Sequence, residues 1–402
     1  MRIDPPQGRR IRTWAALLAL PLLPTATSCR LGDQETATLR STLTMQETLA
    51  STNEGGYERA VSPRKFSFPA DHGPHPEYRS EWWYFTGNLQ TDLGRNFGFQ
   101  LVFFRTAMAP SLEKRASAWA TRQVYMAHFA VTDVGNRRFY AFERFERGAL
   151  GLAGARAAPF NVWLDGWSAQ ADPGSVFPWR LRASAEATAI ALTIEPLKPV
   201  VLRGDEGLSR KGENPGNASY YYSLTRLRTT GTIRIGDQRF PVEGLSWFDR
   251  EWSSSALEDG QVGWDWFALQ LSDGSELSFY QLRRRDGTTD PHSSGTLVTA
   301  DGAAIPLTHD QVLVDVTGSW RSPRDGRSYP HGWRLRIPSA GLDLMVSPYL
   351  DDQELAHAFR YWEGAVKVTG MRGPLDGTPI SGDGYVELTG YADSPRQLLS
   401  LR

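Results

Sequence analysis

Aromatic rings and ionisable side chains are concentrated in one stretch of the chain, residues 244–283. It contains four tryptophans, Trp247, Trp252, Trp264 and Trp266, which lie beside the charged residues Asp249, Arg250, Glu251 and Asp265. Ligand pockets are usually lined in this way, by apolar rings with a few polar groups among them. A carboxyl group buried among such rings has a raised pKa, so it can stay protonated and donate a proton to a bound molecule.

A purely structural interpretation of this stretch stays open. In that interpretation the tryptophans are core residues, and Asp249-Arg250-Glu251 forms an ion pair at the rim of a barrel. In either case the stretch is typical of the last strand of one β-domain followed by the first hairpin of a second.

Length and composition limit the classes of protein that fit. A chain of 402 residues is long enough for two ordinary domains and a tail. Its 44 basic and 45 acidic residues nearly cancel, so no charge imbalance recruits nucleic acid or an anionic membrane surface. Aromatic residues reach 11%, and 38 glycines and 25 prolines punctuate the chain, which favours many short strands joined by turns.

Period-two alternation predicts an antiparallel sheet. In the hairpin formed by residues 81–105, with its turn at 90–96, alternation places Phe97, Phe99, Leu101 and Phe103 on one face. Further strand-like runs follow at short intervals, and no segment shows a sustained apolar repeat of helical period. We therefore predict an all-β fold in which the sheet closes into a barrel, because closure removes exposed edges.

Internal repetition predicts two copies of this unit. Trp83-Tyr84-Phe85 is similar to Trp266-Phe267-Ala268, and Trp179-Arg180-Leu181-Arg182 is similar to Trp333-Arg334-Leu335-Arg336. Later segments, 222–231 and 361–370, also match. The sequence predicts two tandem barrels, at 64–245 and 246–402.

The N-terminus has the pattern of a targeting segment. Arg9, Arg10 and Arg12 precede an apolar run, Trp14 to Leu23, which is too short to span a bilayer. Small residues then lead to Cys29, the only cysteine. This resembles a bacterial lipoprotein signal (1–29), although Ala26 stands where the pattern prefers Leu, and it implies lipidation of Cys29 and a membrane anchor. Plain secretion is the alternative.

Residues 30–63 are rich in Thr, Ser, Glu, Gln and Ala, which predicts a flexible tether, with folded sequence beginning near Phe66. Arg30, rather than an acidic residue, follows the predicted lipidation site. The general lipoprotein pattern then implies a protein that is exported, anchored in the cell envelope and facing the periplasm, at the outer membrane.

Five blocks resemble those of the AttH-like proteins, which group with the carotenoid 1,2-hydratases (hydroxyneurosporene synthases) and are often labelled secreted hydrolases. They are EWWYFTGNL (81–89), WFDREWSS (247–254), GWDWFALQL (263–271), YWEGAV (361–366) and GYVELTGY (384–391). The resemblance covers nearly all the chain after the tether. It implies two tandem lipocalin-like antiparallel β-barrels and a possible ABC transporter permease as a partner.

The hydratase chemistry that this resemblance implies needs no cofactor. A carboxylic acid protonates an isolated C=C bond, aromatic faces hold the resulting carbocation, and water adds to it. The candidate acids are Asp249, Glu251 and Asp265, and the candidate faces are Trp247, Trp252, Trp264, Trp266 and Tyr280. Arg250 stands where the hydratases carry a histidine, and it favours ionisation of its acidic neighbours, which argues against this reaction.

Other chemistries fit the sequence poorly. No Gly-x-Ser-x-Gly motif exists near Ser246, so a serine hydrolase has no nucleophile. His72 and His75, with Glu77 and Glu81, lack a usual zinc spacing, and we predict no metal site. The start of the hairpin, Glu81-Trp82-Trp83, is typical of a barrel floor with Arg79 or Arg105 stacked on an indole.

Two functions from different classes follow. The first is a binding protein that holds an apolar small molecule or lipid, with the membrane and a transporter as partners and no nucleic acid. Its expected ligand-binding residues are Trp82, Trp83, Tyr84, Trp247, Arg250, Trp252, Trp264, Trp266 and Tyr280. The second is a hydratase or lyase acting on the same kind of molecule. A carboxyl group buried in the pocket with no cation in reach would favour the enzyme, whereas three arginine-paired carboxylates would exclude it.

Overall fold

The computed structural model describes residues 55–111, 117–255, 257–373 and 377–391, which belong to one compact unit of the chain. The predicted signal segment, Cys29 and residues 30–54 of the predicted tether lie outside the described residues, so these assignments stay predictions. In the described ranges, no helix is long and apolar enough to cross a bilayer.

The first of two large antiparallel sheets has thirteen strands, in the order β4-β3-β2-β1-β13-β12-β9-β8-β7-β6-β5, with β10 and β11 also paired to β12. Their bounds are β1 (Ser80–Gln90), β2 (Asn96–Ala107), β3 (Gln123–Asp133), β4 (Arg138–Arg147), β5 (Ala153–Ala157), β6 (Phe160–Leu164), β7 (Trp167–Ala171), β8 (Trp179–Ala185), β9 (Thr188–Pro196), β10 (Val201–Leu202), β11 (Leu208–Arg210), β12 (Ala218–Ile235) and β13 (Gln238–Ser253). We call these strands the first sheet.

The second sheet has ten strands, in the order β17-β16-β15-β14-β25-β24-β22-β21-β18, with β23 paired to β24. Their bounds are β14 (Gln261–Leu271), β15 (Glu276–Arg284), β16 (Ser294–Val298), β17 (Ala304–Thr308), β18 (Leu313–Val316), β21 (Trp333–Ile337), β22 (Leu342–Pro348), β23 (Glu354–Ala356), β24 (Arg360–Arg372) and β25 (Thr378–Leu388). Two further strands, β19 (Ser319–Arg321) and β20 (Ser328–Pro330), form a separate hairpin, and the short 3-10 helices are η1 (Ala70–His72) and η2 (Pro338–Ala340).

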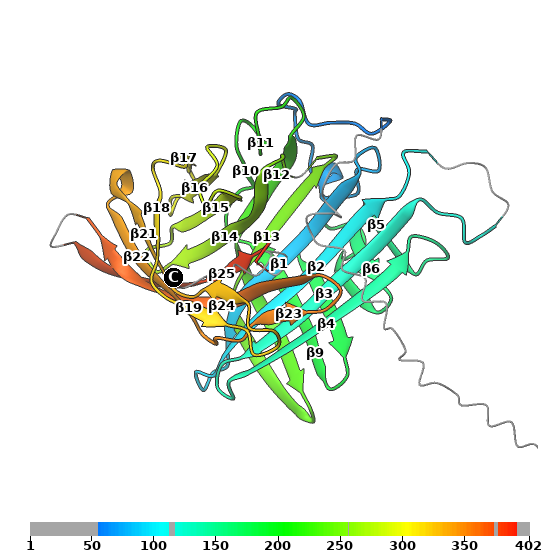
Figure 1. The fold of residues 1–402 in the computed structure, drawn as a ribbon. Helices are drawn as coiled ribbons and strands as arrows, with labels where there is room; N and C mark the ends of the chain where they lie inside the picture. The colour runs from blue at the N-terminus through cyan, green and yellow to red at the C-terminus, as the bar shows by residue number, and fades with distance from the viewer. Residues whose placement is uncertain (1–54, 112–116, 256, 374–376, 392–402) are drawn as a thin grey trace, which may run out of the picture. The chain divides into compact units, whose positions relative to one another are not determined.

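The two sheets repeat one strand order (Figure 1). Four strands in chain order lead outwards from a central pair, β1–β13 in the first sheet and β14–β25 in the second. Each sheet curls into a nearly closed barrel around its own apolar core, which contains Trp83, Trp167, Trp179 and Trp252 in the first and Trp333 and Trp362 in the second. The prediction of an all-β fold with two tandem lipocalin-like antiparallel barrels is confirmed.

Side chains help to close the first barrel between its two edge regions. The guanidinium of Arg144, on β4, lies 4.5 Å from the ring centroid of Trp167, on β7. The same guanidinium donates a hydrogen bond of 3.2 Å to the carbonyl of Ser184, on β8. A cation over an indole therefore joins strands that do not share a backbone ladder.

The outer faces of the two sheets meet in a seam that has approximate two-fold symmetry. Asn88 of β1 donates a hydrogen bond to the carbonyl of Gly384 on β25, and Gln270 of β14 donates one to the carbonyl of Ser246 on β13. These contacts are reciprocal, as in an isologous dimer interface. They make Asn88 equivalent to Gln270 and Ser246 equivalent to Gly384.

The strand that connects the two barrels runs further than its predicted end. β13 continues through the predicted division at 245/246 and ends at Ser253, so the chain passes from one sheet to the other at 254–260. Packing also begins before Phe66, because Ala60 is buried and the Tyr57 hydroxyl donates to the Ala107 carbonyl at 3.0 Å. The predicted division into two domains itself stays a prediction.

Candidate functional site

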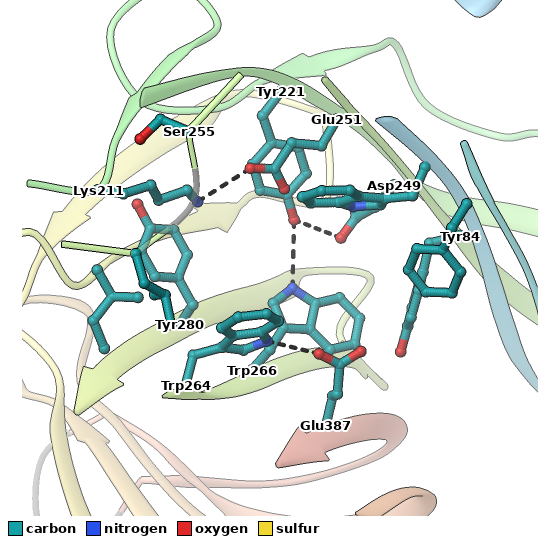
Figure 2. A pocket seen from close by; sticks show the side chains of 14 residues that line it. Tyr84, Lys211, Tyr221, Asp249, Glu251, Ser255, Trp264, Trp266, Tyr280 and Glu387 are labelled. Carbon is teal, nitrogen blue, oxygen red and sulfur yellow. Dashed lines mark hydrogen bonds and ion pairs between the residues drawn. The ribbon is translucent and has the colours of Figure 1, made fainter. Parts of the chain in front are cut away.

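A pocket lies in the seam, between the outer faces of the two sheets (Figure 2). The first sheet and its loops contribute Trp82, Tyr84, Phe104, Lys211, Tyr221, Asp249, Glu251, Ser255 and Leu257, and the second contributes Trp264, Trp266, Tyr280, Leu282 and Glu387. The pocket is therefore outside both barrel interiors, in the seam where the two barrels meet.

Strand alternation explains which side chains reach the pocket. Neighbouring residues of a strand point to opposite faces, so Trp82 and Tyr84 of β1 face the seam while Trp83 faces the first barrel's core. In the same way Trp264 and Trp266 of β14 line the pocket, whereas Asp265 points to the other face. Each strand thus supplies every second residue to the site.

Asp249 is a buried carboxyl group in the pocket wall that forms no ion pair within the described part of the chain. It accepts hydrogen bonds from the Tyr221 hydroxyl at 2.5 Å, the Ser223 hydroxyl at 2.6 Å and the Trp247 indole nitrogen at 2.7 Å. Burial raises the pKa of Asp249, while the charge of Arg203 and these three donors oppose the rise. Asp249 therefore meets the criterion that favours catalysis.

Glu387 is a second buried carboxyl group in the same pocket, on β25. It accepts one hydrogen bond, of 2.6 Å, from the indole nitrogen of Trp264. Burial raises the pKa of Glu387 to about 7, against that hydrogen bond and with help from the charges of Asp249 and Glu251. A group with this pKa is partly protonated at neutral pH and can serve as an acid.

A third carboxyl group, Glu363 of β24, lies directly across the ladder from Glu387. It is buried in the seam, and it accepts hydrogen bonds from the Tyr84 hydroxyl and the side-chain amide of Gln100. Burial, and then the like charge of Glu387, raise the pKa of Glu363 well above its usual value. Two adjacent carboxyl groups in an apolar seam thus favour a bound proton.

Glu251 differs from these groups because it has a cationic partner. The ammonium of Lys211 lies 3.4 Å from its carboxylate and 3.8 Å from the ring centroid of Tyr280. Ser219 also donates a hydrogen bond to Glu251. This pairing suits Glu251 to holding Lys211 at the pocket better than to a role as an acid.

Asp265 lies away from the pocket, contrary to its prediction as a candidate acid there. Its carboxylate is 2.9 Å from Arg283 and accepts hydrogen bonds from the Tyr391 hydroxyl at 3.0 Å. It sits on the inner face of the second sheet because it alternates with two pocket tryptophans. Asp265 is therefore a structural ion-pair residue.

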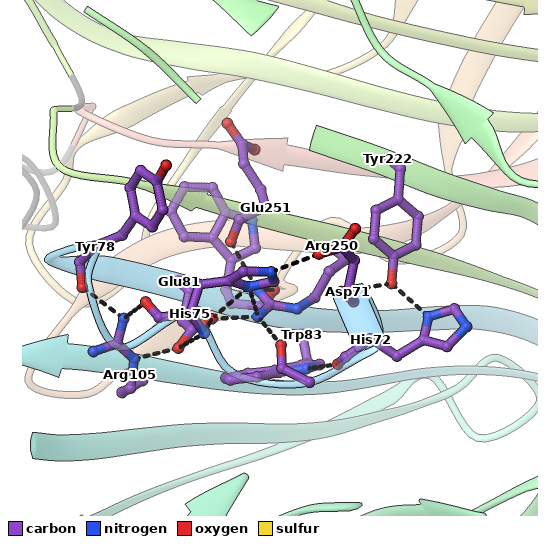
Figure 3. Close-up of polar contacts among 12 residues, drawn as sticks. Asp71, His72, His75, Tyr78, Glu81, Trp83, Arg105, Tyr222, Arg250 and Glu251 are labelled. Atoms are coloured by element: carbon purple, nitrogen blue, oxygen red, sulfur yellow. Dashed lines mark hydrogen bonds and ion pairs between the residues drawn. The ribbon is translucent and has the colours of Figure 1, made fainter. Parts of the chain in front are cut away.

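Three predicted ligand-binding residues, Trp83, Arg250 and Trp252, are likewise placed inside the first barrel (Figure 3). Arg250 pairs with the buried Glu81, which also pairs with Arg105. Burial opposes ionisation of Glu81, but the charges of Arg250 and Arg105 outweigh it and hold the pKa of Glu81 well below its usual range. Glu81 thus provides a buried charge partner for both guanidinium groups.

An arginine stacks on an indole at the start of the hairpin, as predicted, but it is a different arginine. The Arg250 guanidinium lies 4.0 Å from the ring centroid of Trp83, whereas we predicted Arg79 or Arg105 in that position. Trp247 has an intermediate place, in the seam behind the pocket, where it orients Asp249. Of the nine predicted ligand-binding residues, the structure brings together five in the pocket: Trp82, Tyr84, Trp264, Trp266 and Tyr280.

The two neighbouring histidines take part in internal contacts of the first barrel. His72 bonds to the Tyr222 hydroxyl at 2.6 Å, and burial, with the charge of Arg250, lowers the pKa of His72 to about 3. His75 bonds to Asp71 at 3.1 Å and stacks on Trp252. Among the residues that the structure describes, no group of three or more His, Cys, Asp or Glu side chains is arranged to hold a metal ion.

The sequence analysis missed Glu363, Glu387, Lys211 and Tyr221. Both glutamates stand in blocks that carry the family resemblance, and Glu387 occupies the position in β25 that Asp249 occupies in β13, three residues beyond the reciprocal contacts of the seam. A correct alignment of the two halves would have identified Glu387. Lys211 lies in a loop, and no pattern in the sequence placed it near the pocket.

Fold and site together define a tandem β-barrel protein with buried carboxyl groups in an aromatic pocket between the barrels. The AttH-like family model matches residues 59–391, and the chain belongs to the AttH-like family. The resemblance predicted from the sequence blocks is confirmed.

Solved structures support the same assignment. An AttH structure from Nitrosomonas europaea is 37% identical, with a TM-score of 0.73, and the match covers 83% of this chain and 99% of that one. Kievitone hydratase from Nectria haematococca is 16% identical, with a TM-score of 0.63, and covers 84% of this chain and 96% of its own. At that identity the second likeness shows the fold alone.

Curated relatives include enzymes of water addition and removal. Dehydratase asqC of Emericella nidulans is 23% identical over 224 residues, which cover 52% of this chain and 60% of the relative. Kievitone hydratase of Fusarium solani subsp. phaseoli is 23% identical over 217 residues, which cover 52% of this chain and 59% of the relative. The chain thus matches about 60% of the length of these relatives. The relatives support the hydratase-type alternative better than the binding-protein hypothesis that we placed first.

Proposed function

We propose that this protein is a hydro-lyase that adds water to, or removes water from, an apolar molecule held in the pocket between the two barrels. The observation that carries the proposal is the pair Asp249 and Glu387, two buried carboxyl groups without a cationic partner in the described chain, on equivalent strands of one aromatic pocket. The names of the relatives, a hydratase and a dehydratase, support the same class of reaction.

Different surroundings suit the two carboxyl groups to opposite roles. Glu387 has one hydrogen-bond donor and a pKa of about 7, so it fits the acid that protonates one carbon of a C=C bond. Asp249 accepts three hydrogen bonds, which favour its ionised form, so it fits the base that takes a proton from the attacking water. Two carboxyl groups whose environments separate their pKa values are a recurrent acid–base arrangement.

The aromatic wall would stabilise the charge that forms between these two steps. Protonation by Glu387 leaves a cation at the neighbouring carbon, and the faces of Trp82, Trp264 and Trp266 border the space where it would lie. The oxygen of water then bonds to that carbon, and a proton of the water passes to Asp249. Dehydration follows the same steps in reverse.

A direct test uses water labelled with oxygen-18. The purified protein is incubated with acyclic isoprenoids and prenylated phenols that carry a trisubstituted C=C bond, and products are analysed by mass spectrometry. We expect at least one product that carries one labelled oxygen. The product should be lost with Glu387→Gln and retained with Asp265→Asn, which changes a carboxyl group on the opposite face of β14 as a matched control.

Carriage of an apolar ligand is the second candidate function, because aromatic and aliphatic side chains dominate the pocket wall. Native mass spectrometry of the protein purified from its source tests it. Retention of a lipid or isoprenoid by the wild-type protein, without uptake or loss of water for any probe, would favour carriage over catalysis. If the protein neither retained a ligand nor catalysed a reaction, both functions would be contradicted.

Export and anchoring through Cys29 stay proposals, supported by the pattern of the N-terminal sequence. The proposed location is the periplasmic side of the envelope, at the outer membrane, with an ABC transporter permease as a partner. Fractionation of cells that express the wild-type chain or Cys29→Ala tests the anchor. We expect the wild-type protein in the membrane fraction and the variant outside it; equal distribution would contradict lipidation.

A further inference from the structure

A chain of buried polar groups leads from the pocket to the edge of the seam. It begins at Tyr84, whose hydroxyl donates a hydrogen bond to Glu363. The side-chain amide of Gln100 donates both to Glu363 and to the Tyr361 hydroxyl, so these two groups lie side by side, and the Tyr361 hydroxyl is 2.7 Å from Nδ1 of His128. His128 Nε2 is 3.3 Å from the carboxylate of Glu143. The chain crosses between the sheets twice, because Glu363 and Tyr361 lie on β24 and the other three lie on β1, β3 and β4.

Burial isolates the middle of this chain from solvent, while its far end reaches the surface. The side chain of His128 is 0% exposed and that of Glu143 is 9% exposed. Glu143 also accepts hydrogen bonds from the backbone N–H groups of Ala358, at 3.1 Å, and Phe359, at 3.4 Å, and these hold its carboxylate in place. Groups of this kind are rarely buried without function or structural need.

All the hydrogen bonds in the chain can point in one direction. Glu143 is ionised, since its hydrogen bond with His128 and the nearby charge lower its pKa against the effect of burial. His128 then donates through Nε2, and its Nδ1 accepts from Tyr361. The hydroxyl oxygen of Tyr361 accepts from protonated Glu363, and Glu363 accepts from Tyr84.

We infer that Tyr84, Glu363, Tyr361, His128 and Glu143 form a proton relay that connects the pocket with solvent. One proton enters at the Tyr84 oxygen, each group passes its own proton to the next, and one proton leaves from Glu143 to bulk water. An outward passage leaves the His128 proton on Nδ1 and reverses the hydrogen bonds, and a proton that then passes inward by the reverse sequence restores the original arrangement. Its use in catalysis rests on the proposed hydro-lyase function.

The pocket needs such a path because an apolar substrate displaces water from it. After one hydration the proton has left Glu387 and another has arrived at Asp249. Asp249 is the cross-strand neighbour of Tyr84, the inner end of the relay. A route through the seam would restore both carboxyl groups while the substrate still covers the pocket.

Other titratable groups near the relay favour a neutral interior. Glu387 faces Glu363 across the ladder, and the Tyr385 hydroxyl shares the seam. Burial, followed by the charges of the glutamates, raises the pKa of Tyr361 well above its usual value. In the middle of the relay, Gln100 donates a hydrogen bond of 2.9 Å to the Tyr361 hydroxyl. At the outer end, His357 lies beside Glu143.

The test measures proton exchange in the protein with its pocket occupied by phytane, a saturated isoprenoid that excludes water from the Tyr84 end of the relay. Infrared spectroscopy follows the C=O band of protonated Glu363, assigned by its loss in Glu363→Gln, after rapid mixing into D2O. A pH of about 8.5 is suitable because Glu387 is then mostly ionised. We expect exchange to slow by at least about tenfold in Tyr361→Phe and in His128→Gln, since each removes a transferring group. Either variant suffices, provided that its melting temperature shows a folded protein.

Thr132→Val is the matched control, because the Thr132 hydroxyl makes a seam hydrogen bond of 2.7 Å to Gln353 away from the relay. Exchange in this control should keep the wild-type rate. Wild-type rates in both relay variants would overturn the inference, as would equal slowing in the control. Slowed exchange in a protein without hydro-lyase activity would instead remove the proposed function and leave the relay.

Discussion

The two sheets place a carboxyl group at the same position and surround it differently. Asp249 of β13 pairs across the ladders with Tyr84 and Ser223, and it accepts three hydrogen bonds. Glu387 of β25 pairs with Trp266 and Glu363, and it accepts one. The three donors oppose the rise in the pKa of Asp249 that burial causes, whereas burial and the nearby carboxylates raise the pKa of Glu387 to about 7.

This difference shows how a repeated fold can produce an acid–base pair. Approximate two-fold symmetry brings equivalent positions of both sheets to one pocket. Changes on neighbouring strands then separate the pKa values of the two groups, because donors lower a carboxyl pKa and a like charge raises it. The symmetry of the two sheets places both carboxyl groups in one pocket, and the differences between their neighbours give the two groups different chemical roles.

The largest effect is expected when the acid of the pair, Glu387, is removed. Glu387→Gln should lower kcat of the labelled-water reaction by about 10³, since a general acid contributes on the order of 10² to 10⁴. Asp249→Asn should reduce kcat as well and should also alter the pH profile, because the three donors around it remain. The measurement is initial rate against pH for both variants. Full activity in Glu387→Gln would contradict the assignment of the acid.

The barrel interiors differ at an equivalent position too, and the second prediction uses that difference. Arg250 of β13 is fully buried beside Glu81, whereas Leu388 follows Glu387 in β25. Arg250→Met should destabilise the protein by about 3–5 kcal/mol, because it leaves Glu81 with one of its two guanidinium partners. Urea unfolding measures the loss. The matched change Leu388→Met conserves volume and should lower the free energy of unfolding by less than about 1.5 kcal/mol. Equal losses in the two variants would show that the ion cluster contributes no more to stability than apolar packing at the equivalent position.

The third prediction concerns the pH dependence of stability that Glu387 imposes. Its pKa is about 7 in the folded protein and about 4.5 when unfolded, so the folded state binds the proton more tightly. This stabilisation is fully present below about pH 4.5 and is lost as the pH rises through 7. The free energy of unfolding of the wild type should therefore fall relative to that of Glu387→Gln, by about 3 kcal/mol from pH 4.5 to above pH 7.

Urea unfolding at several pH values checks this third prediction. The solvent-exposed Glu243 of β13 provides a matched control, Glu243→Gln, whose difference from the wild type should stay nearly constant. A constant difference for Glu387→Gln would mean that Glu387 is not held protonated by the pocket.

The fold could be predicted because its determinants are local. Period-two alternation, turns rich in Gly and Pro, and matched blocks in both halves predict antiparallel barrels without knowledge of distant contacts. The pocket could be predicted only in part. Asp249 and five aromatic residues stand in the predicted set, but two of the three hydrogen-bond donors to Asp249 come from the neighbouring strand β12, 28 and 26 residues earlier in the chain.

The incorrect site predictions have one main physical cause, which is that side chains were assigned to the wrong face of their strand. Aligning Trp83-Tyr84-Phe85 with Trp266-Phe267-Ala268 shifts the repeat by one residue, because the seam makes Tyr84 equivalent to Trp266. A shift by one residue moves a side chain to the opposite face. Trp83 was therefore grouped with pocket residues, and the match of Asp249 with Glu387 was missed. Sheet order and seam contacts, which settle the register, are not encoded in any one strand.

The smallest expected effects test the symmetry itself through Asn88 and Gln270. Asn88→Ala removes one seam hydrogen bond, of 3.0 Å, and should destabilise the protein by about 1 kcal/mol. Gln270→Ala removes two, of 2.7 and 2.9 Å, and should cost about 2 kcal/mol. The two losses should add within about 0.5 kcal/mol in the double variant, since the bonds share no partner. Urea unfolding measures them, with the exposed Gln90→Ala of β1 as a control near zero. If Asn88→Ala left the free energy of unfolding unchanged while Gln270→Ala lowered it, only the Gln270 contacts would stabilise the seam. The reciprocal Asn88 contact would then be a remnant of duplication that does not contribute to stability.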